Sequence, residues 1–228
     1  MIKAVIFDFD NTLMDFMKMK RAAVEAAVDD MIDAGLPVKK AEMIDKIYKI
    51  YWNEGIEDQF IFDKVLTKEF GKIDYKILAS GIIGYRRAKE AALTLYPHVH
   101  LTLTGLARMG LKMAVVSDAP RLPVWLRICG LGLQHYFDAV VTSDDSGVKK
   151  PHVKPFQMAL SKLAVQPQEA IMIGDWAERD VVGAKAAGMK VVFARYGDLQ
   201  NTEQSGADYE LDDIAGLLAI IAHENAGV

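Results

Sequence analysis

Cysteine is almost absent from this chain of 228 residues. Because Cys129 is the only cysteine, no intrachain disulfide can form, which is typical of a protein from a reducing compartment. Cys129 lies in an apolar, helix-like stretch with no histidine at metal-ligand spacing. We therefore expect it to be a small buried side chain rather than a metal ligand.

Long apolar runs and an excess of basic charge are also missing. No apolar stretch approaches the ~20 residues that span a bilayer, and the first residues lack the basic-then-apolar layout of a secretory signal. The formal net charge is −4, whereas nucleic-acid-binding domains are typically basic. Walker-type and complete glycine-rich nucleotide loops are absent as well. We expect a cytoplasmic protein that binds neither membranes nor nucleic acids.

What the chain does have is a strand-like segment at its start and, after residue 97, a regular alternation of helix-like and strand-like segments. The predicted strands cover residues 2–9, 112–116, 139–141, 170–173 and 191–193, and the predicted helices cover about 100–109, 123–129, 156–163, 179–187 and 211–221. Such alternation favours a doubly wound parallel sheet with helices on both faces, a Rossmann-like α/β fold. With 51% hydrophobic residues, the chain has enough apolar sequence for this core and a second, inserted unit.

Residues 14–96 lack this alternation and show helical spacing throughout. Four amphipathic helices are predicted, separated by Gly35-Leu36-Pro37, by residues 53–55 and by Gly71. Gly81 and Gly84 weaken the pattern in the middle of the fourth helix. Tyr48, Tyr51 and Trp52 are expected in the interior of this helical block.

Two aspartates follow the first strand. Asp8 and Asp10 share one face if the strand continues that far, and two carboxylates about 4 Å apart repel by roughly 4 kcal/mol at an effective dielectric constant near 20. Such a pair needs a cation, a shared proton or a chemical role. A solvated turn is the alternative, because aspartate and asparagine are common turn residues.

Three further polar groups follow other predicted strands: Ser117-Asp118, Lys149-Lys150 and Gly174-Asp175. In an open parallel sheet, ligands bind beyond the carboxyl ends of the strands, where the strand order reverses. Residues more than a hundred positions apart in the sequence are therefore expected in one pocket.

These motifs, taken together and in order, resemble those of the haloacid dehalogenase-like hydrolase superfamily. The first is Asp8-Phe9-Asp10-Asn11-Thr12-Leu13 and the second is Val116-Ser117-Asp118. Lys150-Pro151 forms the third, and Gly174-Asp175 followed by Asp180 forms the fourth. The resemblance implies a hydrolase core at residues 1–13 and 97–228 and a helical cap at residues 14–96.

The resemblance also gives the first two aspartates their roles. Asp8 would attack phosphorus and form an aspartyl-phosphate. Asp10 would act as general acid toward the leaving group and then as general base toward water. Asp10 also distinguishes the phosphatases of the superfamily from its dehalogenases, which lack the second aspartate and need no metal.

A cluster of carboxylates beside a phosphate favours Mg²⁺, a cation that prefers hard oxygen ligands. The resemblance implies that Asp8, the backbone carbonyl of Asp10, and Asp175 bind this ion, with Asp180 in the outer shell. Helix capping is the alternative role for Asp175, and stabilisation of a helix dipole is the alternative for Asp180.

The remaining candidates are expected to bind the transferred phosphate. Ser117 and Asp118 lie where a hydroxyl and backbone amides face phosphate oxygens at a helix N-terminus, although Ser117 also suits a simple N-cap. Lys150 would neutralise charge on Asp8 and on the phosphoryl group. Lys149 is its neighbour and competitor, but the Lys-Pro order favours Lys150.

The sequence therefore predicts a Mg²⁺-dependent phosphatase for a small phosphorylated metabolite. A phosphomutase of the same superfamily is the first alternative, because it uses the same carboxylates. A receiver-type signalling module and a non-catalytic binding protein are alternatives from other classes, and the helical block argues against the receiver. Either a monomer or a homodimer is compatible with the sequence.

Overall fold

The core of the molecule is one parallel sheet. The computed structural model describes residues 1–226, and within them six strands pair in the order β3-β2-β1-β4-β5-β6, all parallel. The strands are β1 (Ala4–Phe7), β2 (Lys112–Val116), β3 (Ala139–Val141), β4 (Ala170–Gly174), β5 (Lys190–Ala194) and β6 (Tyr209–Leu211). This is the doubly wound order, which reverses between β1 and β4. The predicted fold class is confirmed.

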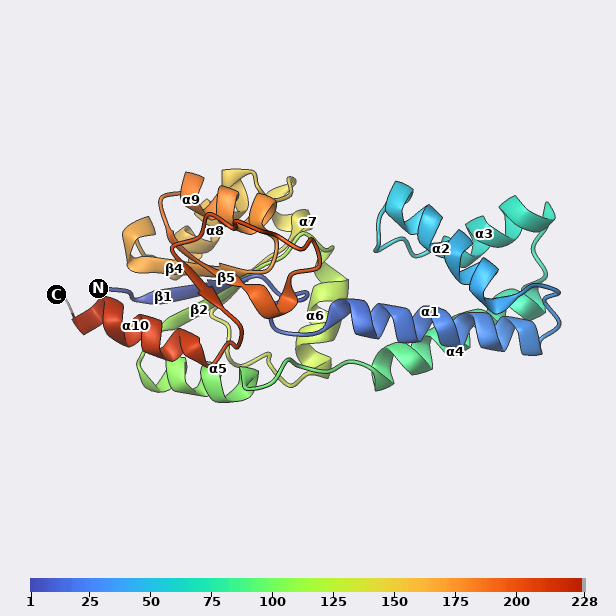
Figure 1. Cartoon of the computed structure of the whole chain (residues 1–228), viewed down its shortest axis with the longest axis horizontal. Helices are drawn as coiled ribbons and strands as arrows, with labels where there is room; N and C mark the ends of the chain where they lie inside the picture. Colours follow the sequence, from blue (N-terminus) through green and yellow to red (C-terminus); the bar gives the residue numbers. More distant parts are fainter. Residues whose placement is uncertain (227–228) are drawn as a thin grey trace. The chain divides into compact units, whose positions relative to one another are not determined.

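Helices cover both faces of the sheet (Figure 1). They are α5 (Val99–Arg108), α6 (Arg121–Gly130), α7 (Ser143–Ser146), α8 (Val153–Leu163), α9 (Val182–Ala186) and α10 (Gly216–Ala226). Helices α8 and α9 pack on one face, where alternate strand residues such as Ala4 and Ile6 meet Phe156. Helices α5 and α10 lie on the other face (Figure 1). Because both faces are covered, all four residues of β1 are apolar and buried.

The first strand is shorter than predicted, Ala4–Phe7 rather than residues 2–9, and the structure differs from the predicted elements in three further places. Leu211, expected in the last helix, belongs to the short edge strand β6, and α10 begins at Gly216. The loop predicted at residues 142–155 contains α7, which a capping box at Thr142 begins. The helix expected near residue 179 starts as a π turn, Ala177–Val181, and becomes α-helical only at Val182.

Cys129 is exposed, so the prediction of a buried cysteine is wrong. Helix α6 buries Val124, Arg127 and Ile128, which lie at the i, i+3 and i+4 positions of one face. Cys129 lies beyond this face. An arginine thus lies on the buried face of this helix, between two aliphatic residues.

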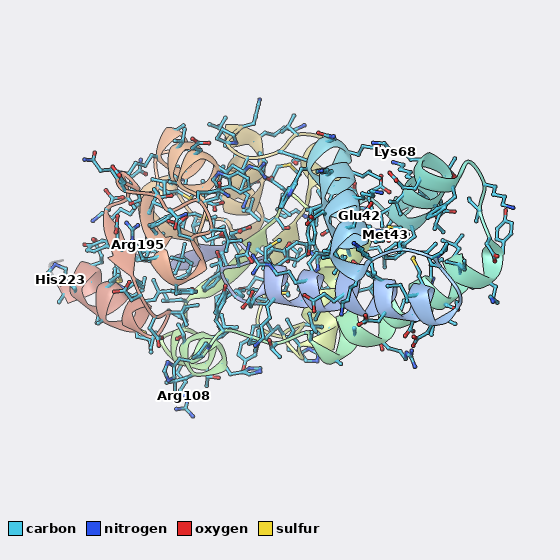
Figure 2. All side chains as sticks on the ribbon, turned by 45° about the vertical axis from the view of Figure 1, so that its right-hand side comes forward. Glu42, Met43, Lys68, Arg108, Arg195 and His223 are labelled. Carbon is cyan, nitrogen blue, oxygen red and sulfur yellow. The ribbon has the colours of Figure 1, made fainter. Side chains whose placement is uncertain are left out.

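The helical unit consists of α1 (Phe16–Asp33), α2 (Lys40–Glu54), α3 (Ile61–Phe70) and α4 (Tyr75–Ala91). Its interior is apolar: on α2, for example, Met43 is buried and the adjacent Glu42 is exposed, and Figure 2 labels both. Tyr51 is buried as expected, whereas Trp52 is 65% exposed, contrary to the prediction. Helix α4 is continuous through Gly81 and Gly84.

These two glycines let α4 approach α1 closely. A Cβ atom at Gly84 would lie 2.7 Å from the backbone oxygen of Ala26, and one at Gly81 would lie 2.1 Å from the side chain of Met31. The glycines that weakened the helical pattern in the sequence therefore serve the packing of two helices.

By its contacts the chain divides into two compact units, Met1–Asp15 with the chain from Thr94 onward, and Phe16–Leu93. The core thus runs to residue 15 rather than 13 and resumes at residue 94 rather than 97. A role for the helical unit as a cap stays a prediction. Among residues 1–226, no helix is both long and apolar enough to cross a bilayer.

Candidate active site

The turn after β1 places Asp8 and Asp10 at the carboxyl end of the sheet. The Asp8 amide donates to the Ile173 carbonyl of β4 at 2.8 Å, so Asp8 continues the strand ladder. The chain then turns back, with Asn11 at φ 60° and its amide donating to the Met14 carbonyl at 2.8 Å. Asp8 is consequently fixed between the two strands where the strand order reverses.

Three buried carboxylates gather around this point. Asp8, Asp175 and Asp180 each offer an oxygen within 4.8 Å of the others. Asp175 follows β4, and Asp180 comes from the π turn after it, where its Oδ2 accepts from the Trp176 amide at 3.0 Å. A π turn is a common device at functional sites. Here it directs Asp180 into the cluster instead of leaving it at a helix terminus.

Lys150 is the cation of the cluster. Its Nζ donates to Asp8 Oδ1 and to Asp180 Oδ1, both at 2.6 Å, and the residue is 6% exposed. Burial alone would lower the pKa of Lys150, but Asp180, Asp8 and Asp118 together raise it above its usual value. The side chain therefore stays charged. Lys149 is exposed, so Lys150 is the lysine that reaches the cluster.

The carboxylates themselves hold protons more tightly than ordinary aspartates do. Burial raises the pKa of Asp8, and Lys150 opposes that rise. Burial and the neighbouring Asp8 and Asp180 raise the pKa of Asp175 well above its ordinary value. Burial raises the pKa of Asp180 to about 6. Such a cluster is short of positive charge, which favours a bound cation.

Side chains from the first motif and from the end of β5 support this cluster. Thr12 donates from Oγ1 to Asp175 Oδ1 at 3.0 Å. Tyr196 donates from its hydroxyl to the Thr12 carbonyl at 2.9 Å. A Cβ atom at Gly197 would lie 1.8 Å from the Asn11 backbone oxygen, so only glycine fits there. Tyr196 and Gly197 lie outside every predicted motif, and no feature of the sequence indicated their roles.

The second motif lies after β2, beside the cluster's lysine. Ser117 is 4% exposed, and its Oγ accepts from the Ala119 amide at 3.2 Å. Asp118 Oδ1 accepts from the Lys150 backbone amide at 2.8 Å, and Oδ2 lies 3.4 Å from the Arg179 guanidinium. Asp118 thus holds the backbone of the lysine loop. Arg179 also stacks on Trp176, with its Cζ 3.6 Å from the ring centroid.

Asp10 has a partner that the sequence did not suggest. Arg127 Nη1 on α6 donates to Asp10 Oδ2 at 2.7 Å. The arginine side chain is 2% exposed and the Asp10 side chain 21% exposed. Helical periodicity could have placed Arg127 on a face with Val124 and Ile128, but nothing in the sequence linked that face to Asp10.

The donor set fits a hard divalent cation. Buried carboxylate oxygens at short mutual distances are the ligands that Mg²⁺ and Ca²⁺ prefer, and cysteine and histidine do not belong to this cluster. Asp180 already has Lys150 on one oxygen and the Trp176 amide on the other. Asp8 and Asp175 are therefore the carboxylates best placed to bind a metal.

Fold and site together define a doubly wound α/β protein with an aspartate cluster where the strand order reverses, between β1 and β4. The model of the family described as haloacid dehalogenase-like hydrolase matches residues 5–194. The chain belongs to this family, as its motifs predicted.

Several proteins similar to this chain are named phosphatases. Glyceraldehyde 3-phosphate phosphatase from Methanocaldococcus jannaschii is 34% identical over 224 residues, which cover 97% of both chains. The protein of the same name from Pyrococcus furiosus is 34% identical over 229 residues, covering 98% of this chain and 95% of its own. The crystal structure of a HAD phosphatase from Thermococcus onnurineus is 27% identical, covers 96% of this chain and 98% of that one, and has a TM-score of 0.71. These relatives confirm the prediction of a phosphatase within the family.

Proposed function

We propose that the protein is a Mg²⁺-dependent phosphatase that hydrolyses a small phosphate monoester through an aspartyl-phosphate on Asp8. The observation that carries the proposal is the position of Asp8: its Oδ1 lies 2.6 Å from the Lys150 ammonium, beside the carboxylates of Asp175 and Asp180. A carboxylate in this setting is oriented and charge-compensated, as a nucleophile toward phosphorus must be.

The reaction would proceed in two displacements at phosphorus. In the first, an Asp8 oxygen bonds to phosphorus while the ester P–O bond breaks, and Asp10 gives a proton to the departing oxygen. In the second, water attacks the aspartyl-phosphate, Asp10 takes a proton from that water, and Asp8 leaves as a carboxylate. Inorganic phosphate and an alcohol are the products.

Charge compensation would come from both sides of the transferred group. Asp8, Asp175 and the backbone carbonyl of Asp10 would hold Mg²⁺, which when bound lowers the charge repulsion between carboxylate and phosphate. Asp180 would stay in the outer shell and keep Lys150 in place, since its two oxygens accept from Lys150 and from Trp176. Ser117 and the amides after it would hold the phosphate oxygens, with Asp118 supporting Lys150 through its backbone.

For the substrate we propose a short phosphorylated metabolite, with glyceraldehyde 3-phosphate as the first candidate. The support is the name shared by two relatives of nearly full coverage. A phosphoglycolate phosphatase from Pectobacterium atrosepticum is 35% identical over a shorter stretch, 62% of this chain, so phosphoglycolate is the second candidate.

The test is phosphate release by the purified full chain with Mg²⁺, on a panel of both candidates, sugar phosphates and nucleotides. We expect turnover that EDTA abolishes and Mg²⁺ restores. Asp8→Asn should lose at least about a thousandfold in kcat, and the control Asp45→Asn, an exposed aspartate of α2, should lose none. Near-normal turnover by Asp8→Asn would contradict the assignment. An isomerised ester without free phosphate would instead indicate a phosphomutase, and a stable phosphoprotein would indicate a receiver.

A further inference from the structure

Among the described residues, Arg127 has the largest side chain that is almost completely buried, with 2% exposure. It lies on the inner face of α6 between two aliphatic residues, Val124 and Ile128, where an apolar side chain would satisfy the packing. A buried guanidinium loses its hydration and is retained only where its partner compensates for that loss. Packing alone therefore gives no reason for an arginine at this position.

Arg127 donates a hydrogen bond to the Asp10 carboxylate. Nη1 and Oδ2 are 2.7 Å apart, a short charge-assisted hydrogen bond between residues 117 positions apart in the sequence. Asp10 lies in a turn, next to Asn11 with its positive φ, and its backbone forms only an isolated bridge with Met14. Asp10 therefore lies outside the regular strands and helices that hold other side chains in place. Helix α6, by contrast, is a regular element whose start is held in place. It follows the Ser117 motif, and the Ser143 hydroxyl donates to the carbonyl of Ala119, two residues before the helix begins.

We propose that Arg127 is a positioning residue for the acid–base step. It fixes the Asp10 carboxylate through Oδ2 and so orients the group that gives a proton to the leaving group and then takes one from water. Arg127 keeps all of its own protons throughout, and only Asp10 gains and loses one. The inference rests on the proposed phosphatase function and adds a residue that none of the four motifs contains.

A leaving-group comparison separates this role from a merely structural one. Protonation of the departing oxygen matters much for an alkyl phosphate and little for 4-nitrophenyl phosphate, whose leaving group is stable as an anion. We therefore expect Arg127→Met to lower kcat/KM for an alkyl phosphate by roughly 10- to 100-fold and for 4-nitrophenyl phosphate by less than about threefold. Arg127→Lys, which keeps the charge, should recover part of the loss.

The matched control is Arg121→Met on the same helix. Arg121 is a 55% exposed side chain that pairs with Asp145, and its replacement should leave both substrates unaffected. A double-mutant cycle gives the second readout: once Asp10→Asn has removed the acid, adding Arg127→Met should change kcat/KM by less than about twofold. If Arg127→Met does not fold, as thermal unfolding would show, Arg127→Lys carries the same comparison.

Equal losses on both substrates, or full additivity with Asp10→Asn, would overturn the positioning role and leave the phosphatase proposal intact. Absence of turnover in the unmodified protein would instead refute the proposed function, and this inference with it. The two failures are therefore distinguishable.

Discussion

The two units of this protein bury polar side chains to very different extents. Among the described residues, the buried polar and charged ones, tyrosines aside, are Asp8, Thr12, Lys20, Thr102, Ser117, Arg127, Thr142, Ser146, Lys150, Asp175, Asp180 and Ser205. Only Lys20 belongs to the helical unit. Burying ions seldom improves stability over a well-packed apolar interior. Stability therefore does not explain why buried charged residues gather at one edge of the core sheet, and their position there indicates a functional site.

Each unit also buries one lysine, and the two lysines make different contacts. Lys150 in the core lies between two carboxylates, both 2.6 Å away. Lys20 in the helical unit donates to the Tyr85 hydroxyl at 2.9 Å and lies 4.3 Å from the centroid of the Tyr51 ring. Aromatic faces attract a cation without being charged themselves. The core unit thus places its buried lysine between two carboxylates, an arrangement that suits phosphoryl transfer.

The largest effect should come from breaking the charge cluster at its lysine. We expect Lys150→Met to lower kcat by about 100- to 1,000-fold, because the charge beside the transferred phosphoryl group is lost. The same change should lower the free energy of unfolding by about 3–5 kcal/mol, since it leaves Asp8 and Asp180 buried without their shared cation. Steady-state kinetics and urea unfolding measure the two quantities. Lys149→Met, at the exposed neighbour, should change neither, and a comparable loss there would contradict the assignment of Lys150.

Two glycine substitutions sharpen the comparison between the units. A Cβ at Gly197 would meet the Asn11 backbone oxygen, whereas the nearest atoms to a Cβ at Gly81 belong to the flexible side chain of Met31. Both changes to alanine should cost about 1–3 kcal/mol of stability through overpacking. Only Gly197→Ala should also displace the first motif, and we expect it to lower kcat/KM at least about tenfold. Equal activity of the two variants would show that the Asn11 turn does not position the site.

The metal-free protein should lose stability as pH rises. Burial raises the pKa of Asp180 to about 6, and the pKa values of Asp8 and Asp175 are raised as well. In the window from about pH 4 to about pH 6 the folded state therefore binds more protons than the unfolded state, and the free energy of unfolding falls with pH. Thermal unfolding in EDTA at several pH values measures this.

Adding Mg²⁺ at neutral pH should reverse the loss, by about 2.7 kcal/mol at a hundred times its Kd. Asp175→Asn should abolish most of that gain. A melting temperature that does not change with Mg²⁺ at any pH would argue against a metal at this cluster.

Much of this could be predicted from the sequence, because parallel strands place their carboxyl ends at one edge. Asp8, Asp175 and Lys150 each follow an apolar strand or its loop, and the structure brings them together. The helical unit was recognisable from its 3.6-residue spacing. The metal, the individual residue roles and the cytoplasmic location stay predictions.

What the sequence did not reveal depends on tertiary contacts. The direct contact of Asp180 with Lys150 arises from a π turn, which periodicity does not distinguish from an ordinary helix start. Arg127 interrupts an apolar face, and only the folded sheet shows that this face meets Asp10. Strand β6 has three residues, none of them fully buried, so its pattern was too short to separate from the helix that follows.

The smallest expected effect concerns a buried polar group away from the cluster. Thr102 on α5 is 0% exposed, and among the described residues its hydroxyl has no hydrogen-bond partner. Thr102→Val keeps the volume and removes an unsatisfied group, so we expect a stabilisation of about 1 kcal/mol, or roughly 2–4 °C in Tm. The same change at Thr12, whose hydroxyl donates to Asp175, should destabilise the protein. Calorimetry on both variants would show whether buried polar groups here are maintained for the site or merely tolerated, and two shifts of the same sign would contradict the distinction.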